Sequence, residues 1–327
     1  MLVSCLLVLI GFGLLIYGAD VFVDGAANIA RQLGMPPLII GLTIVGFATS
    51  APEIIVGSVS AWQDKTAIAI GNALGSNITN IGLVLGLSIL VIPITIASKT
   101  IKKEYGLMSV AIIIGLLVMM DGYLSRMDAS ILLISLVILL GSIVWMAKQS
   151  PASDPLADEF AHEFSDEASK PDSLGKAFAK LLFGLIVLLI GAELLVRGAV
   201  SIAEFFGVPD LVIGLTIVAI GTSLPELAAS IISLKKDEAD IAVGNIIGSN
   251  MFNMLAVLGI PALINPDHFL PEVLNRDFPA MIILSVLLGI MVFASSKGKL
   301  TRPEGIVLLL CFITYQYVLF SQSIITA

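Results

Sequence analysis

The sequence has 327 residues, of which 57% are hydrophobic and 13% charged, and its mean hydropathy is +1.04. Soluble domains carry about 25% charged residues, so this composition excludes an ordinary soluble protein and indicates an integral membrane protein. The net charge is −8, and much of it lies in one segment. We expect a lipid bilayer around the chain, no nucleic-acid partner and no obligatory protein partner.

Long apolar runs predict ten membrane-spanning helices. A run of ~18 or more apolar residues is long enough to cross a bilayer. The sequence therefore predicts an all-α polytopic membrane protein with ten transmembrane helices. In chain order the expected spans are 1–29, 37–62, 67–95, 105–121, 128–147, 177–202, 210–234, 240–264, 278–295 and 304–324.

One sustained polar stretch, residues 153–173, interrupts these spans. It predicts a linker over 149–175, between a first unit of residues 1–148 and a second of 176–327. A solvated flexible loop is the simpler interpretation of its acidic residues. The alternative is a regulatory cation site formed by Asp158, Glu159, Glu163 and Asp166.

The two units are copies of one another. The segment "LIYGADVFVDGAANIARQLGMPPLIIGLTIVGFATSAPE" aligns with "LLIGAELLVRGAVSIAEFFGVPDLVIGLTIVAIGTSLPE" without a gap, and about half of the positions match. The offset of 173 residues that relates Glu53 to Glu226 also relates Gly71 to Gly244. Nearly the whole chain therefore consists of two five-helix repeats.

The repeats are predicted to be inverted. Five spans are an odd number, so the second copy enters the membrane from the side opposite to the first, a plan common among secondary transporters. Most Lys and Arg residues lie in one set of alternating loops, around Lys102, Lys235 and Lys299, and few lie in the other, such as Arg126 and Arg276. The first set is expected to face the cytoplasm of a bacterial inner membrane, with the linker cytoplasmic and both termini outside.

A proline and a glutamate stand together inside two apolar runs, in "GFATSAPE" ending at Glu53 and "AIGTSLPE" ending at Glu226. Proline lacks a backbone N–H and clashes with the carbonyl four residues earlier, so Pro52 and Pro225 are expected to interrupt each helix and free carbonyl oxygens. In a membrane, such irregular backbone is tolerated only against protein or a hydrated cavity.

Hydroxyl groups accompany each carboxylate on the same helix face. The two sets are Thr49, Ser50 and Glu53 in the first copy and Thr222, Ser223 and Glu226 in the second. Hydroxyl, carbonyl and carboxylate oxygens form a hard ligand set that suits Ca²⁺ or Na⁺ better than soft metals.

A second polar cluster follows in the next span of each copy, in "GNALGSNITN" and "GNIIGSNMFN". Its hydroxyl and amide oxygens recur four residues apart, as Ser76 and Asn80 and as Ser249 and Asn253. The glycines of both motifs allow close helix approach, so these oxygens are expected to reach an ion from the neighbouring helix.

An acidic side chain in a membrane span costs ~3 kcal/mol on insertion scales and is a functional candidate by default. One divalent cation neutralises two ionised carboxylates, whereas several Na⁺ would balance or overfill them. The simpler alternative is that Pro-Glu and Gly-Ser-Asn only kink and pack helices. An intramembrane hydrolase would need a nucleophile or a metal triad, which the motifs lack, so we do not expect an enzyme; a passive channel is a further alternative.

Asp20 and Glu193 are also matched by the repeat. They are interpreted as interfacial charges, with an access path to the site as the alternative.

With its paired signatures "GFATSAPE…GNALGSN" and "AIGTSLPE…GNIIGSN", the chain resembles the cation/calcium antiporter superfamily, most closely its prokaryotic sodium/calcium exchanger branch. The resemblance covers nearly the full length. It implies ten helices in two inverted repeats, with cations bound between the second, third, seventh and eighth. By motif position it implies liganding roles for Thr49, Ser50, Glu53, Ser76, Asn80, Thr222, Ser223, Glu226, Ser249 and Asn253.

The resemblance implies that several Na⁺ exchange for one Ca²⁺ by alternating access, with no cofactor. Asn253 stands where some relatives, including potassium-dependent exchangers, carry Asp, which argues against a K⁺ requirement. Gly75 and Gly248 stand where proton-coupled relatives tend to carry an acid. Sodium coupling is therefore favoured, and a proton- or potassium-coupled calcium antiporter on the same scaffold is the alternative.

Overall fold

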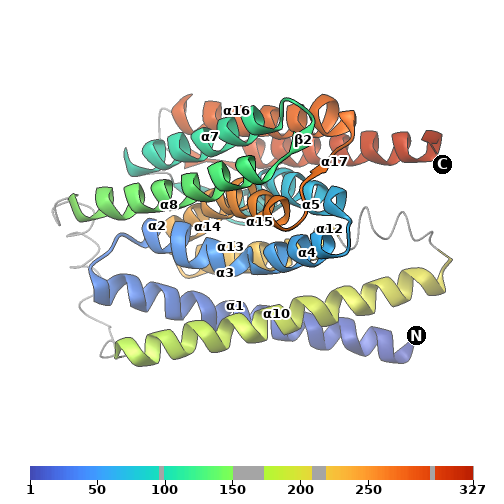
Figure 1. Cartoon of the computed structure of the whole chain (residues 1–327). Coiled ribbons are helices and arrows are strands. Elements are labelled where there is room, and N and C mark those ends of the chain that lie inside the picture. The colour runs from blue at the N-terminus through green and yellow to red at the C-terminus, as the bar shows by residue number, and fades with distance from the viewer. Residues whose placement is uncertain (96–98, 150–172, 208–218, 295–298, 327) are drawn as a thin grey trace.

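The chain folds into long apolar helices that pack side by side (Figure 1). The computed structural model describes residues 1–95, 99–149, 173–207, 219–294 and 299–326. The expected acidic linker, with Asp158, Glu159, Glu163 and Asp166, lies almost wholly outside the described residues.

The helices of the two halves follow the same order. The first half contains α1 (Leu2–Leu33), α2 (Pro37–Ile40), the π-helix η1 (Gly41–Val45), α3 (Gly46–Thr49), α4 (Ala51–Trp62), α5 (Thr66–Thr79), η2 (Asn80–Leu85), α6 (Gly86–Val91), α7 (Lys99–Met119) and α8 (Arg126–Gln149). The second contains α10 (Leu174–Phe205), α12 (Ala219–Thr222), α13 (Leu224–Lys235), α14 (Ala239–Phe252), η4 (Asn253–Val257), α15 (Leu258–Ile264), η5 (Val273–Asp277), α16 (Phe278–Ala294) and α17 (Arg302–Thr326).

Within the described residues, seven helical stretches are long and apolar enough to cross a membrane. An eighth passes when Pro37–Thr49 and Ala51–Trp62, which meet at a 40° bend, are joined. The chain is therefore a multi-pass membrane protein. Of the remaining expected spans, 105–121 falls on α7, whose first turns carry Lys102, Lys103 and Glu104, and 210–234 lies partly outside the described residues.

The predicted interruptions are present in both halves. Helix α3 ends at Thr49 and α4 begins at Ala51, with Ser50 between them at φ −80° and ψ 2°. Ser223 separates α12 from α13 in the same way, at φ −90° and ψ 6°. Each proline then lies in the first turn of the next helix, where its missing N–H costs no intrahelical hydrogen bond.

Two π-helices also begin at equivalent positions. Helix η2 begins at Asn80 and η4 at Asn253, one directly after α5 and the other directly after α14. A π-turn changes the direction in which side chains leave the helix, and such turns are frequent at functional sites.

The first helices of the two halves, α1 and α10, cross along one side of the molecule (Figure 1). A Cβ atom at Gly18 would lie 2.3 Å from the backbone nitrogen of Leu188, so only glycine permits this approach. Gly11 meets Leu195 and Gly25 meets Leu181. Because contacts move toward the N-terminus of α10 as they move toward the C-terminus of α1, the two helices run antiparallel.

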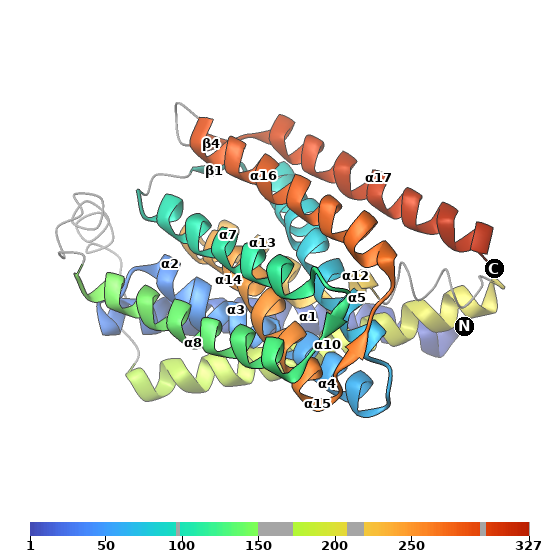
Figure 2. The same ribbon diagram turned by 45° about the horizontal axis from the view of Figure 1, so that its top comes forward.

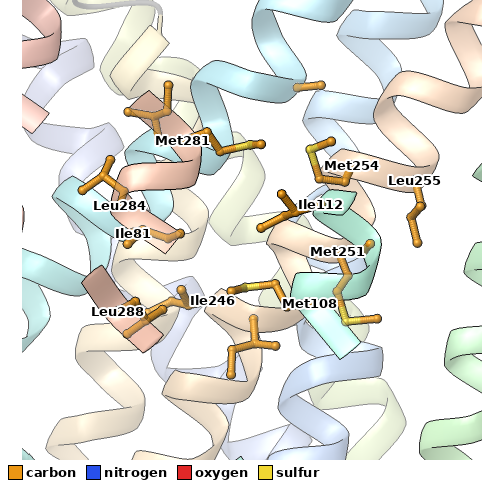
Figure 3. Packing of buried hydrophobic residues seen from close by; sticks show 14 of the residues in the cluster. Ile81, Met108, Ile112, Ile246, Met251, Met254, Leu255, Met281, Leu284 and Leu288 are labelled. Atoms are coloured by element: carbon orange, nitrogen blue, oxygen red, sulfur yellow. The ribbon is translucent and has the colours of Figure 1, made fainter. Parts of the chain in front are cut away.

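The interrupted helices lie at the centre, between the α1–α10 pair and the group of α7, α8, α16 and α17 (Figures 1 and 2). Helix α14 packs against η1 and α13, and α4 packs against α5 and α15. The main apolar core surrounds this centre: Met108 and Ile112 of α7, Met251 of α14, and Met281 and Leu284 of α16 contribute to it (Figure 3).

Two pairs of short antiparallel strands join the halves, a feature that the all-α prediction missed. Strand β1 (Ile94–Thr95) pairs with β4 (Lys299–Leu300), and β2 (Tyr123–Leu124) pairs with β3 (Asp267–His268). Backbone groups of loops that pack on a protein need hydrogen-bond partners, and another loop can supply them. These runs are too short to leave a periodic signal in the sequence.

Candidate cation-binding site

Two fully buried carboxylates mark the centre of the molecule. Glu53 and Glu226 are both 0% exposed, and each lies in the first turn of the helix that follows a break, α4 or α13. Free N–H groups and the helix dipole make the start of a helix favourable for negative charge. The two carboxylates also lie within electrostatic range of each other.

Hydroxyl groups surround this carboxylate pair. Thr49 and Ser50 lie close enough to the Glu226 side chain to act on it across the boundary between the halves, and Ser76 does the same at Glu53, but no hydrogen bond joins these hydroxyls to either carboxylate. All three hydroxyl residues are buried. The second half thus contributes an acid to the hydroxyls of the first break, as the inverted plan would require.

A hydrogen-bond network ties the first break to α14. The Thr49 hydroxyl donates to Oδ1 of Asn245 at 2.9 Å and lies 3.3 Å from Oγ of Ser249. The Ser249 hydroxyl donates to the Gly46 carbonyl oxygen at 3.4 Å. These contacts place Thr49 and Ser249, two of the predicted ligands, side by side.

Many oxygen atoms at this centre have no hydrogen-bond partner among the described residues. They include both oxygens of Glu53 and of Glu226, the hydroxyls of Ser50 and Ser223, and Oδ1 of Asn80 and of Asn253. A buried polar atom without a partner is costly, and native proteins leave few of them. Carboxylate, hydroxyl and amide oxygens are the ligands of hard cations, so the residue types present fit such an ion.

The side chains at this centre offer oxygen ligands, which suit a hard cation rather than a soft metal. Within the described part of the chain, no group of three or more His, Cys, Asp or Glu side chains is placed to hold a metal ion. The carboxylates occur as a pair and neutral oxygens supply the remainder. Such a set offers two negative charges, and the number of charged ligands is one of the properties that tune Ca²⁺ affinity.

One predicted residue differs from its repeat equivalent. Thr49 is fully buried, whereas Thr222 is half-buried. The other eight predicted residues are buried in both halves. The symmetry of the motifs is therefore reproduced in the helix breaks and carboxylates but not in the surroundings of the two threonines.

Sequence reasoning missed two asparagines that hold the glutamate backbone. Nδ2 of Asn72 donates to the Glu53 carbonyl oxygen at 3.2 Å, and Nδ2 of Asn245 donates to the Glu226 carbonyl oxygen at 3.4 Å. Nδ2 of Asn245 also lies 3.2 Å from Oγ of Ser230. The signal was available, because both asparagines follow the first glycine of the two "GN" motifs at the same offset.

The glycines of the second-half motif allow a close approach between the two halves. A Cβ atom at Gly248 would lie 2.1 Å from the Leu42 carbonyl oxygen, and one at Gly244 would lie 2.4 Å from the Leu38 carbonyl oxygen. Their equivalents, Gly75 and Gly71, meet no described atom within 4 Å. Helix α14 is thus pressed against the broken helix of the first half. The repeat equivalents of Leu38 and Leu42, positions 211 and 215, lie outside the described residues.

The second pair of matched acids lies at the surface. Asp20 forms an ion pair with Lys236 at 2.9 Å, and Glu193 pairs with Arg197 at 2.5 Å. Their side chains are 54% and 57% exposed. This arrangement favours interfacial charges over the access path that was the alternative.

A profile of the family described as "Sodium/calcium exchanger protein" matches residues 3–145 and 176–321, one match in each half of the chain. The chain belongs to the sodium/calcium exchanger family. As a member, it is a multi-pass cation/Ca²⁺ antiporter of the prokaryotic branch of the cation/calcium antiporter superfamily, and it transports ions rather than catalysing a covalent reaction.

Relatives of this exchanger match over nearly the whole chain. A protein of Alkalimonas amylolytica described as "Putative antiporter CaxA" is 47% identical over 325 residues, which cover 98% of this chain and 100% of the relative. The sodium/calcium exchanger MaX1 of Methanosarcina acetivorans is 32% identical, with 97% and 99% covered. The solved sodium/calcium exchanger from Methanococcus jannaschii superposes with a TM-score of 0.81 at 34% identity, covering 96% of this chain and 97% of that one.

Proposed function

We propose that this exchanger moves Ca²⁺ against Na⁺ through one cation site that opens alternately to the two sides of the membrane. The observation that carries the proposal is the pair of buried carboxylates, Glu53 and Glu226, whose oxygens have no hydrogen-bond partner among the described residues. Two negative charges buried away from water are unfavourable unless a cation neutralises them, and either Ca²⁺ or Na⁺ can do so. The two ions then exclude one another, which is the condition for exchange.

The proposed ligands are the residues predicted from the two motifs. The first copy contributes Thr49, Ser50, Glu53, Ser76 and Asn80, and the second contributes Thr222, Ser223, Glu226, Ser249 and Asn253. Burial of nine of them and the nearness of Thr49 and Ser50 to the Glu226 side chain support the assignment. Asn72 and Asn245 are proposed as positioning residues that hold the backbone of the two glutamates.

The proposed architecture is ten membrane helices in two inverted repeats, 1–148 and 176–327, joined by a cytoplasmic linker, with both termini outside. The antiparallel crossing of α1 and α10 supports inversion, because these helices are repeat equivalents. Alternating access is proposed on the same plan. In an inverted-repeat transporter, an exchange of conformation between the repeats closes one side and opens the other.

The charge of the site bears on the coupling ion. Asn80 and Asn253 are neutral, so the proposed site holds two carboxylates. One Ca²⁺ or two Na⁺ balance this charge, and a third Na⁺ would leave an excess positive charge. The absence of a third acid among these ligands also supports independence from K⁺. Proton or potassium coupling on the same scaffold is the competing proposal.

Purified protein in proteoliposomes tests the proposal. Na⁺, K⁺ and H⁺ gradients are imposed one at a time, and Ca²⁺ accumulation is measured. We expect an outward Na⁺ gradient alone to drive uptake, with no requirement for K⁺ on either side. Uptake driven by a K⁺ or H⁺ gradient but not by Na⁺ would establish the competing proposal, and Ca²⁺ efflux that needs no counter-ion would indicate a channel.

A further inference from the structure

The turns that follow α4 and α13 have the same backbone in the two halves. Asp64 and Asp237, which are 173 residues apart, both have a φ of 59°, in the left-handed region. The next residue of each turn, Lys65 or Glu238, donates its backbone N–H to a serine carbonyl at 2.8 Å and caps the start of the helix that follows. Lys65 and Glu238 therefore occupy equivalent positions and carry opposite charges.

The ends of α1 and α10 show the same reversal of charge. Arg31 lies in the last turn of α1, and its equivalent in the last turn of α10 is Glu204. Nη1 of Arg31 lies 4.0 Å from Oε1 of Glu238, and these two residues are called the formed pair. The repeat offers a second combination of Glu204 with Lys65, called the reversed pair, in which acid and base have exchanged places.

Of these four described residues, only the two of the formed pair are joined here. Lys65 and Glu204 are exposed, and neither forms an ion pair with another described residue. The helices differ in the same sense, because α1 packs along α13 whereas α10 makes little contact with α4. The contact that carries the formed pair is therefore closed, and its repeat equivalent is open.

A further ion pair supports the closed contact. Nζ of Lys236 lies 2.9 Å from Oδ1 of Asp20 and donates to the Asp20 carbonyl oxygen at 3.1 Å, which ties the turn after α13 to α1. The equivalents of these residues are Gln63 and Glu193. Gln63 is neutral, and Glu193 pairs with Arg197 of its own helix. The equivalent residues at the open contact can therefore form one ion pair, where the closed contact has two.

We propose that the formed pair and the reversed pair alternate as one latch, and that each of them closes one side of the exchanger. This latch rests on the alternating access proposed above, in which the repeats exchange conformations. After the exchange, α10 packs on α4 as α1 now packs on α13, which brings Glu204 to Lys65. Close backbone contacts such as that at Gly18 couple α1 to α10. The same movement therefore withdraws α1 from α13 and breaks the formed pair.

The charges of the latch set its strength and its bias. The Arg31 side chain is 59% exposed, so water and salt screen the formed pair. One exposed ion pair shifts an equilibrium between two states by about fivefold at most, which leaves ion binding at the centre able to reverse it. Because Lys236 adds a second ion pair to the closed contact, the latch favours the conformation of this structure.

Cross-linking of cysteine pairs tests whether the two pairs alternate. In a full chain whose two native cysteines are replaced by serine, the formed pair becomes Arg31→Cys with Glu238→Cys, and the reversed pair becomes Lys65→Cys with Glu204→Cys. A short, reducible thiol cross-linker is applied in vesicles that contain Na⁺ and Ca²⁺. We expect each pair to cross-link, each link to stop Ca²⁺ uptake, and reduction to restore it.

A chain with all four cysteines shows whether the two links exclude one another. Mass spectrometry should find molecules with either link and none with both. Both links in one molecule, or no link between positions 65 and 204, would overturn the latch. This readout needs no ion gradient, so it decides the latch even if Na⁺ fails to drive uptake, which would contradict the proposed function alone.

Charge reversal tests the chemistry of the latch. Lys65→Glu opposes Glu204 with a like charge and should slow Na⁺-driven Ca²⁺ uptake by about twofold to fivefold. Adding Glu204→Lys restores an ion pair of opposite polarity and should recover the rate, which a purely structural role would not predict. Arg197→Glu, which reverses an exposed charge of α10 outside the latch, is the matched control and should leave the rate unchanged. Failure of the double variant to recover, or an equal loss in the control, would overturn the proposal.

Discussion

The two halves of this exchanger carry nearly the same motifs and are packed differently. Thr49 of the first half is fully buried, while its equivalent in the second half, Thr222, is half-buried. Two peripheral acids that the repeat relates also differ, because Asp277 is paired and Glu104 has no hydrogen-bond partner among the described residues. Two copies of one sequence pattern can thus occupy two environments within one chain.

The largest expected effect concerns the feature in which the halves agree. Glu53→Gln and Glu226→Gln should each abolish Na⁺-driven Ca²⁺ uptake into vesicles, because either change removes half of the site charge. Loss of a charged ligand at a dry site costs about 3 kcal/mol or more, which corresponds to more than about a hundredfold in Ca²⁺ affinity. Undiminished uptake in both variants would refute the shared site.

The next effect concerns the close contact between the halves. Gly248→Ala places a methyl group 2.1 Å from the Leu42 carbonyl oxygen, a backbone atom that cannot move aside. We expect Gly248→Ala to lower stability by about 3 kcal/mol, the upper end for overpacking. Apparent Tm and the yield of monodisperse protein measure the loss, and an unchanged Tm would contradict the expectation.

The asparagines that hold the glutamate backbone should show a smaller difference. Asn245 bonds Thr49, Ser230 and the Glu226 carbonyl from a fully buried position, while Asn72 is half-buried and makes one such bond. Asn245→Ala should weaken Ca²⁺ binding by about 2 kcal/mol and Asn72→Ala by about 1 kcal/mol. Isothermal titration with Ca²⁺ provides the comparison; a stronger effect at Asn72 would reverse our ranking.

The smallest effect is expected at the surface ion pairs of α1 and α10. Lys180 of α10 bonds Asp24 of α1 at 2.7 Å, whereas the Glu193–Arg197 pair stays within α10. Because all four side chains are at least one third exposed, water and salt screen both pairs. Asp24→Asn should cost no more than about 1 kcal/mol and Glu193→Gln less, as judged by apparent Tm at low and high salt. A larger, salt-independent loss at Asp24 would show that this pair is buried by lipid.

Sequence reasoning recovered the features that depend on local chemistry. The breaks at Ser50 and Ser223 follow from the prolines two residues later, since proline cannot continue a helix that precedes it. The buried state of Glu53 and Glu226 follows from their place in apolar runs. The strand pairs were missed because they are two residues long, and the bonds from Asn72 and Asn245 were missed because they join side chains to backbone on other helices.

By itself the sequence determined that the chain is a membrane protein and that it contains one five-helix unit twice. It also determined which residue types lie at the centre of the molecule. Composition, period and motif spacing are properties of the chain that do not change with conformation. Only the tertiary structure decided which glycines are closed against a neighbouring backbone and which buried acid lacks a partner. Both features depend on which residues meet across the two halves, and a repeated motif does not specify those contacts.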